Sequence, residues 1–144
     1  MALNLEEAFR VFQAKKWHSQ MAWSAVADNG ISVITLWTDL HSFNKDTKVE
    51  SWSCFNQGNW WYDTTGNKQR IMHLHNALDN CQSFFRAIMV TPVSTDVESR
   101  EIDFTKGCKP AEHKWWKIEE FNSQTGEFSA ICRWEWNKSE SFPV

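Results

Sequence analysis

The chain has 144 residues, of which 42% are hydrophobic and 23% are charged, proportions that are typical of a globular domain and exclude the disordered class. Its formal net charge of −3 excludes the strongly basic field that drives non-specific binding to duplex nucleic acid. Because domains have a typical size of about 100–150 residues, we expect a single domain over residues 1–144.

Targeting and redox features of the sequence are few. Residues 1–7 show no basic stretch followed by an apolar run, and no segment approaches about 18 uninterrupted apolar residues, so we expect neither a signal peptide nor a membrane-spanning helix. The widely spaced cysteines form no CxxC pair and are interpreted as reduced, mostly buried thiols of a cytoplasmic protein, with one disulfide as the alternative. These cysteines are Cys54, Cys81, Cys108 and Cys132.

The first third of the chain predicts a helix and a hairpin. Apolar residues at helical spacing follow the candidate cap Asn4 and predict an amphipathic helix over about 4–16. The period then changes to that of strands in 21–26 and 31–37, and the Asn29-Gly30 pair between these runs is typical of a hairpin turn.

The middle of the chain alternates between strand and helix signals. A polar loop over 39–47 precedes a predicted strand over 49–55, and a second amphipathic helix is predicted over about 69–82. Residues 84–90 are apolar at nearly every position, a pattern that is typical of a central strand covered on both faces.

The last third predicts strands only. A short strand is expected over 100–105, followed by strands over 115–121 and 127–136 that are joined by a hairpin loop at 122–126. Together these elements predict an α+β fold in which two amphipathic helices pack on a curved, largely antiparallel sheet, a barrel-like form included.

Tryptophan is the most unusual component of the composition. The chain has ten tryptophans, ten phenylalanines and one tyrosine, and each aromatic side chain buries about 150–250 Å². A domain of this size buries only about 70% of its surface, and each buried indole N–H needs an acceptor. We therefore expect several indoles to line a pocket or a subunit interface; an unusually Trp-rich core is the alternative.

The aromatic triplet Trp60-Trp61-Tyr62 lies between two predicted turns, 57–59 and 64–67. One interpretation is part of an aromatic cage that attracts a cationic or methylated ligand or stacks on a flipped base or a sugar. The other is a homo-oligomer interface, where Trp and Tyr are also enriched.

An arginine interrupts the apolar strand over 84–90. Arg86 must either be paired or face a cavity. Its partner could be Asp103 or Glu101, or the anionic group of a ligand. In the second case Arg86 would be the charged anchor of the pocket.

Lysines and indoles gather in the segment 106–117. This composition is typical of surfaces that follow phosphates and stack on bases. We favour a solvated lysine loop that leads into a strand with one inward indole, because neighbouring strand residues face opposite sides. The residues concerned are Lys106, Lys109, Lys114, Trp115, Trp116 and Lys117.

No metal, cofactor or catalytic motif is specific enough to use. His73 and His75 are two apart on a predicted helix and point away from each other, so they could not share an ion even with Cys81 or His113 added. Residues 65–68 lack the loop length and the following Ser or Thr of a phosphate-binding loop. We expect no metal, no cofactor and no catalytic residue.

Residues 70–131 carry a pattern that supports a resemblance. It consists of Arg70 opening the helix, residues 73–77, the strand 85–90, Arg100, residues 115–118 and residues 125–128. The pattern resembles PUA-like barrel modules found beside restriction and modified-base systems, which implies a pocket that reads nucleic acid. Taken whole, the chain also resembles the single-domain proteins carried on mobile integron gene cassettes, which implies a novel or diverged fold and self-association.

These observations predict a non-enzymatic domain that binds a small or flat ligand in a Trp-lined pocket and forms a homodimer. One alternative is a small enzyme with acid and base residues in the loops around Asp39, Asp63 and His41; another is a protein whose surplus aromatics all serve an interface with a partner. The candidate ligand-binding residues are Trp60, Trp61, Tyr62, Arg86, Trp115 and Trp116.

Overall fold

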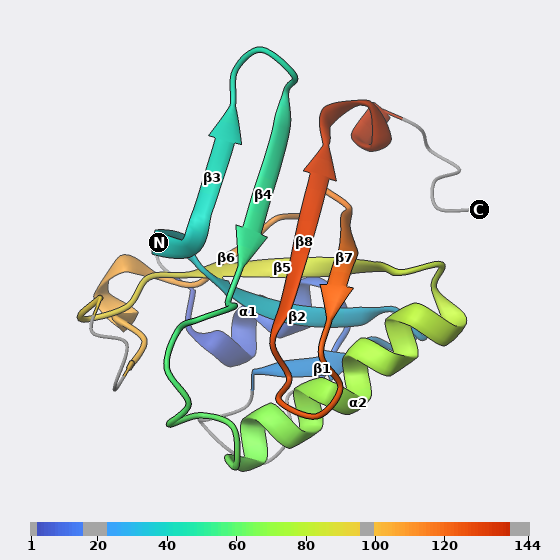
Figure 1. Ribbon diagram of the computed structural model, residues 1–144. Helices are drawn as coiled ribbons and strands as arrows, with labels where there is room; N and C mark the ends of the chain where they lie inside the picture. Colours follow the sequence, from blue (N-terminus) through green and yellow to red (C-terminus); the bar gives the residue numbers. More distant parts are fainter. Residues whose placement is uncertain (1–2, 16–22, 96–99, 139–144) are drawn as a thin grey trace.

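Two helices and eight strands make up the regular structure of residues 3–15, 23–95 and 100–138, which the computed structural model describes (Figure 1). The helices are α1 (Leu5–Val11) and α2 (Thr65–Asn80). The strands are β1 (Ser24–Val26), β2 (Ser32–Trp37), β3 (His41–Asn44), β4 (Val49–Ser53), β5 (Phe84–Val90), β6 (Lys109–Pro110), β7 (Trp116–Phe121) and β8 (Phe128–Arg133).

All eight strands belong to one mixed sheet. Its order is β1-β2-β5-β7-β8-β4-β3, with β6 paired to β5 beside this path. Only the β2–β5 pairing of the described strands is parallel, and the others are antiparallel. The predicted α+β class is therefore confirmed. The barrel-like form is not observed, because the order of the described strands ends at β1 on one side and at β3 on the other, and the sheet does not close.

Helix α1 begins as the sequence predicts and ends earlier. Asn4 and Glu7 form a reciprocal capping box, in which each backbone N–H donates to the other side chain at 3.0 and 2.8 Å. The helix ends at Val11, since Gln13 adopts a φ of 59° that a right-handed helix cannot contain. The predicted end near residue 16 was wrong by about a turn.

Helix α2 begins four residues before its predicted start. The Thr64 side chain caps it by accepting the N–H of Asn67 at 3.2 Å. Its buried face, which covers part of the sheet, contains Arg70, Leu74 and Ala77 at spacings of four and three residues. An arginine therefore occupies a position where the helix presents its apolar side to the interior.

The predicted strands are mostly present, with three local corrections. Residues 39–47, expected to be a loop, contain β3, whose largely exposed residues give no alternation of apolar and polar side chains. The predicted strand 100–105 is instead one isolated bridge at Ile102 followed by a 3-10 turn over Phe104–Lys106. The predicted last strand ends at Arg133, where a 3-10 helix over Trp134–Lys138 follows. Residues 21 and 22 of the predicted run 21–26 lie outside the described residues.

Strand β5 is the centre of the core, as its apolar sequence predicts. Phe85 and Ala87 pack in a cluster that includes Trp52 and Trp116. Ile88 and Val90, on the opposite face, pack in a second cluster with residues of α1. The alternation follows from the two-residue period of a strand.

The tryptophans divide between the interior and partly covered positions. Trp52, Trp61 and Trp116 are buried, and Trp23, Trp37 and Trp60 pack against the core while remaining partly exposed. Trp134 is exposed. Four of these tryptophans therefore lie outside the fully buried interior.

Two further sequence expectations can be compared with the structure. All four cysteines are buried, as predicted, and Cys54 and Cys81 are free thiols. Among the described residues, neither helix has the length and apolar character needed to cross a membrane.

Candidate functional site

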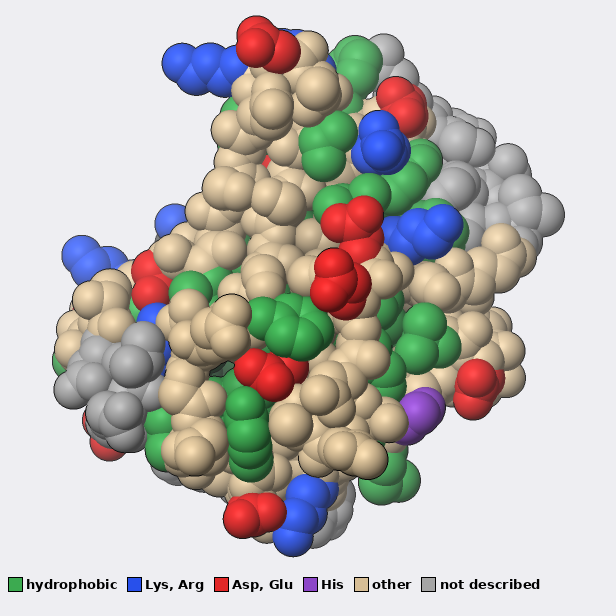
Figure 2. Space-filling model, viewed as in Figure 1, with side chains coloured by type: hydrophobic (Ala, Val, Ile, Leu, Met, Phe, Trp, Pro, Cys, Tyr) green, Lys and Arg blue, Asp and Glu red, His purple; other side chains and the backbone are tan. Residues whose placement is uncertain are grey.

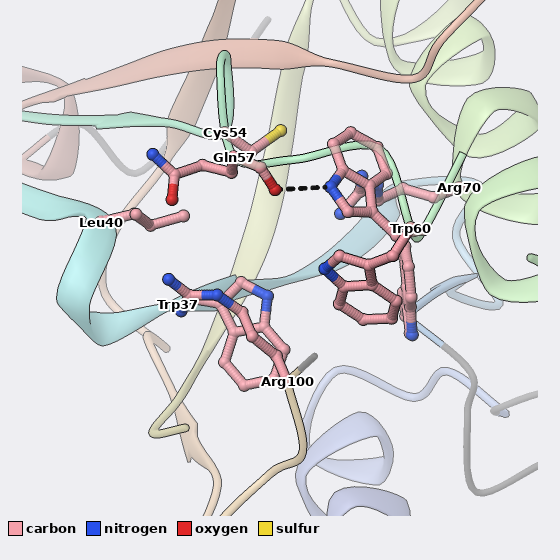
Figure 3. Close-up of a pocket in the computed structure, with 9 residues that line it drawn as sticks. Trp37, Leu40, Cys54, Gln57, Trp60, Arg70 and Arg100 are labelled. Carbon is pink, nitrogen blue, oxygen red and sulfur yellow. Dashed lines mark hydrogen bonds between the residues drawn. The ribbon is translucent and has the colours of Figure 1, made fainter. Parts of the chain in front are cut away.

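Two adjoining cavities share a wall of two indoles and two guanidinium groups, contributed by Trp23, Trp37, Arg70 and Arg100. The larger cavity has a volume of about 370 Å³, which lies near the lower end of the range of about 300–1,000 Å³ that is typical of small-molecule sites. Its other lining residues are Thr35, Glu101, Ile102 and Phe104. The smaller one is completed by Leu40, Cys54, Gln57, Trp60 and Trp61 (Figure 3). We call the two together the Trp–Arg cavity.

The walls of the Trp–Arg cavity come from segments far apart in the sequence. Trp37 ends β2, and Trp60 belongs to the loop between β4 and α2. Arg70 enters from α2, and Figure 3 shows its side chain on the helix side of the cavity, away from Leu40 and Trp37. Arg100 follows the segment 96–99, which lies outside the described residues.

Arg70 is a buried cation without a matching anion. It is 4% exposed, and none of the ion pairs found among the described residues includes it. Its Nη2 donates to Asn67 Oδ1 at 3.1 Å and to the carbonyl of Gly126 at 3.5 Å, whereas its Nε has no hydrogen-bond partner within the described part of the chain. Burial lowers the pKa of Arg70, since desolvation disfavours the charged form.

Aromatic rings surround the Arg70 guanidinium. Its central carbon lies 4.8 Å from the ring centroid of Trp23 and 5.2 Å from those of Trp61 and Phe128. Each such contact stabilises a cation by about 0.5–2 kcal/mol. Ring faces supply partial negative charge but accept no full hydrogen bond, so the guanidinium keeps capacity for an anion.

Arg100 differs from Arg70 because a carboxylate neutralises it. Its Nη1 lies 2.7 Å from Asp39 Oδ1, and its guanidinium carbon lies 5.5 Å from the Trp37 ring centroid. The side chain is nearly as buried, with 8% of the residue exposed. The cavity therefore holds one compensated and one uncompensated arginine.

A second hydrogen-bond donor in this wall is also unfilled. Trp60 Nε1 is buried and has no partner among the described residues. The neighbouring Trp61 Nε1 donates to the carbonyl of Gln57 at 3.1 Å (dashed line in Figure 3). The Trp23 ring packs edgewise on Trp60, with centroids 6.4 Å apart. Trp60 and Arg70 thus contact the same indole and each retains an unused N–H.

The predicted aromatic triplet lies only partly in the cavity wall. Trp60 and Trp61 line it, while Tyr62 packs against the Trp61 ring at 4.8 Å without being a lining residue. Burial and the nearby Glu127 carboxylate raise the pKa of Tyr62. Tyr62 therefore contacts the lining residue Trp61 and does not itself line the cavity.

The other predicted site residues lie outside the Trp–Arg cavity, and two of them, Arg86 and Trp115, line a separate cavity of about 240 Å³. Arg86 stacks on Trp115 at 3.8 Å and donates to the backbone carbonyls of Glu112 and Lys114 at 3.0 and 2.9 Å. These carbonyls, rather than Asp103 or Glu101, are the hydrogen-bond partners of Arg86. Trp116 is 1% exposed and belongs to the core. The six predicted residues therefore occupy three places, and the arginines of the Trp–Arg cavity are Arg70 and Arg100.

The ligand-binding residues predicted from the sequence do not include Trp23, Trp37, Arg70 or Arg100, although Arg70 and Arg100 belong to the pattern that supports the PUA-like resemblance. A signal for Arg70 was available, because Arg70, Leu74 and Ala77 share one face of the helix and a cation there must be paired or face a cavity. The same argument had been applied to Arg86 in a strand. No comparable local signal marks Arg100, whose surroundings come from distant segments.

The histidines of α2 do not face each other. His73 Nδ1 lies 2.6 Å from Ser24 Oγ, and His75 packs against the Phe121 ring at 5.1 Å. The Ser24–His73 spacing is that of a nucleophile and its base, but Ser24 is buried and out of reach of a substrate. Among the residues that the structure describes, no group of three or more metal-ligating side chains could hold an ion.

The loop residues of the enzyme alternative have separate partners. Asp39 pairs with Arg100, and His41 Nε2 lies 2.8 Å from Glu50 Oε1. Asp63 is exposed in the loop before α2. Asp39 is thus engaged in an ion pair and His41 contacts a carboxylate, and the contacts of the described residues do not join the three into one constellation.

The lysine-rich segment does not form an uninterrupted basic surface. Lys114 Nζ pairs with Glu50 at 2.9 Å, and Lys117 lies 5.6 Å from the Phe84 ring centroid. Burial acts to raise the pKa of Glu50, but the hydrogen bonds and charges of Lys114 and His41 outweigh it, so the pKa lies below its ordinary value. On the face seen in Figure 2, acidic and basic side chains alternate, as expected for a solvated surface.

Comparison of the chain with protein-family models, with curated proteins and with solved structures found no match.

Proposed function

We propose that this domain is a non-enzymatic binding protein whose Trp–Arg cavity takes a small, flat ligand carrying a negative charge. The observation that carries the proposal is the uncompensated, buried guanidinium of Arg70 in a cavity wall. A buried cation without an anion is destabilising, and native proteins retain such groups mainly where function uses them. A bound anion would supply the missing partner.

The indole rings in the cavity walls favour a flat ligand. Trp23 and Trp37 line both cavities and Trp60 lines the smaller one, and aromatic rings pack best against other planar groups in stacked or edgewise contact. A volume of about 370 Å³ suits a small molecule rather than a polymer segment.

Tryptophan fluorescence is the direct test. Titration with a panel of nucleotides, single-stranded oligonucleotides, sugars, quaternary amines and aromatic acids is expected to show saturable quenching with anionic, planar members only. The variant Arg70→Met should lose this response. Arg86→Met, which removes an arginine stacked on a different indole, should keep it. Quenching by quaternary amines, or silence across the panel, would contradict the proposal.

Nucleotides are included because of the resemblance to PUA-like modules. A base with its phosphate is planar and anionic, so it satisfies the same wall chemistry. Selective binding of a modified nucleotide would support that resemblance. The buried thiols Cys54 and Cys81 further favour a cytoplasmic location, where cysteines stay reduced.

A second proposal concerns self-association into a homodimer. Strand β3 ends the sheet path and lies on the outer side of the β3–β4 hairpin in Figure 1. Phe43 of β3 is 51% exposed, Trp134 is 57% exposed, and both line one surface hollow with Glu50 and Lys114. Exposed edge strands pair readily with another chain, and a second copy offers the same edge in a two-fold arrangement.

Light scattering coupled to size exclusion tests this second proposal. The wild-type chain should elute as a dimer, and Phe43→Ser should shift it to a monomer without altering the ligand response. A control, Met72→Ser, changes an exposed apolar residue of α2 and should leave the mass unchanged. A monomeric wild-type mass at high concentration would refute self-association.

A further inference from the structure

We infer that the ligand of the Trp–Arg cavity is a small aromatic monocarboxylate whose carboxylate is held by Arg70 and Trp60. This inference rests on the proposed function and specifies the ligand class of the same site. It is carried by three observations: the charge balance of the cavity, the number of unused donors and the shape of the walls.

The charge balance leaves room for one negative charge. Arg70 contributes one uncompensated positive charge, and the charge of Arg100 is cancelled by Asp39 at 2.7 Å. Glu101 also lines the larger cavity, but it is exposed, so water and salt screen its charge. The Cys54 thiol stays neutral, because burial raises its pKa. A monoanion therefore neutralises the one buried charge that lacks a partner, whereas a phosphate dianion would leave one negative charge unpaired in the cavity.

The unused donors match two acceptor atoms. Arg70 Nε and Trp60 Nε1 are both buried and have no partner in the described part of the chain, and both side chains line the smaller cavity and pack on Trp23. The smaller cavity has a volume of only about 20 Å³, which is room for about one water-sized atom. One carboxylate oxygen would therefore lie there within reach of Trp60, and the other would stay with Arg70 at the border of the larger cavity, which Arg70 also lines. A neutral amide would offer one acceptor and would leave the Arg70 charge uncompensated.

The indole walls indicate what the rest of the ligand, apart from its carboxylate, is like. Trp23 and Trp37 line both cavities, as Arg70 does. One or two fused rings fit between such indole faces, and their stacking adds to the charge-assisted hydrogen bonds. The ligand is thus expected to place its acid group on the α2 side and its ring toward Trp37.

Three probes of the same shape separate these features. Isothermal titration at pH 7.5 would compare 2-naphthoate, 2-naphthamide and 2-naphthyl phosphate on the full chain. We expect 2-naphthoate to bind at least tenfold more tightly than either of the others. In Arg70→Met its affinity should fall at least tenfold and its advantage over 2-naphthamide should vanish; in Trp60→Phe the fall should be smaller, about threefold to tenfold. Arg86→Met is the matched control and should bind like the wild type.

The outcomes distinguish this inference from the proposed function. Equal binding of acid and amide, or tighter binding of the phosphate, overturns the monocarboxylate assignment and leaves an aromatic pocket in place. Failure of all three probes overturns both. The comparison of probes on the wild-type chain needs no variant, so it decides the question even if Arg70→Met does not fold. If Arg70→Met folds and retains tight, selective binding of 2-naphthoate, the role of Arg70 is refuted.

Discussion

Replacing Arg70 with methionine separates the cost of burying a charge from the contacts that the arginine makes. Methionine reproduces the aliphatic stem of arginine as far as the position of Nε, and it adapts its shape to irregular interiors. Arg70 is paired with no carboxylate among the described residues, so the substitution leaves no opposite charge stranded. We expect the free energy of unfolding to change by no more than about 2 kcal/mol in either direction.

The magnitude follows from opposing contributions. The variant loses a hydrogen bond from a charged donor to Asn67 at 3.1 Å, which contributes about 1.5–3 kcal/mol, and ring contacts at 4.8–5.2 Å that contribute about 0.5–2 kcal/mol each. It also relieves the desolvation of an ion, which costs several kcal/mol in proteins. These contributions are of similar size and opposite sign.

Urea unfolding followed by circular dichroism measures the difference. Leu74→Ala provides the calibration, because Leu74 is fully buried one turn further along the same helix face and such truncations cost about 2–5 kcal/mol. A loss above about 4 kcal/mol in Arg70→Met would show that the structure already compensates the charge. Arg70 would then be a structural residue, and the argument for a bound anion would fail.

Two further predictions concern a turn and a titrating group. Gly126→Ala should be less stable than Gly30→Ala by at least about 1 kcal/mol, because both glycines have a φ of +87° but only at Gly126 would a Cβ collide with the buried Asn67 amide; urea unfolding of both variants checks this. Burial lowers the pKa of His73, so the unfolded chain binds more protons below its pKa of about 6.5 and stability should decrease as pH falls through that value. His73→Gln should weaken this dependence, and His75→Gln, on the exposed side of the helix, should not.

Equal losses in the two glycine variants would mean that backbone strain alone matters at both turns. For the histidine, melting temperatures measured between pH 7.5 and 5.5 provide the comparison. Identical slopes in the wild type and in His73→Gln would show that some other group controls the pH dependence.

Local elements were predictable wherever the signal is carried by neighbouring residues. The capping pair Asn4 and Glu7, the Asn29-Gly30 turn and the apolar run over 84–90 each determine structure through contacts within a few residues or through burial of a whole strand. The exposed strand β3 was not predictable, because its hydrogen bonds to β4 stabilise it without any apolar pattern.

The sequence indicated that indole rings contribute to the candidate site, but it did not indicate which charged residues lie beside them. An excess of indoles indicated a pocket with Trp60 and Trp61 in its wall. The charged anchor was expected at Arg86, which lines a different cavity with Trp115 and donates to the carbonyls of Glu112 and Lys114. Whether a buried arginine is compensated depends on groups brought in from other segments, and sequence spacing does not reveal them.

The sequence by itself determined an α+β fold, its two helices and a surplus of indole rings, because composition and hydrophobic period act through local geometry and burial. Tertiary structure alone decided that α2, β2 and the loop after β4 would gather Arg70, Trp37 and Trp60 around one cavity, and that Asp39 would neutralise Arg100. The physical reason is that charge compensation is a property of the three-dimensional neighbourhood: the same side chain is a satisfied ion or an unfilled binding group according to which distant residues surround it.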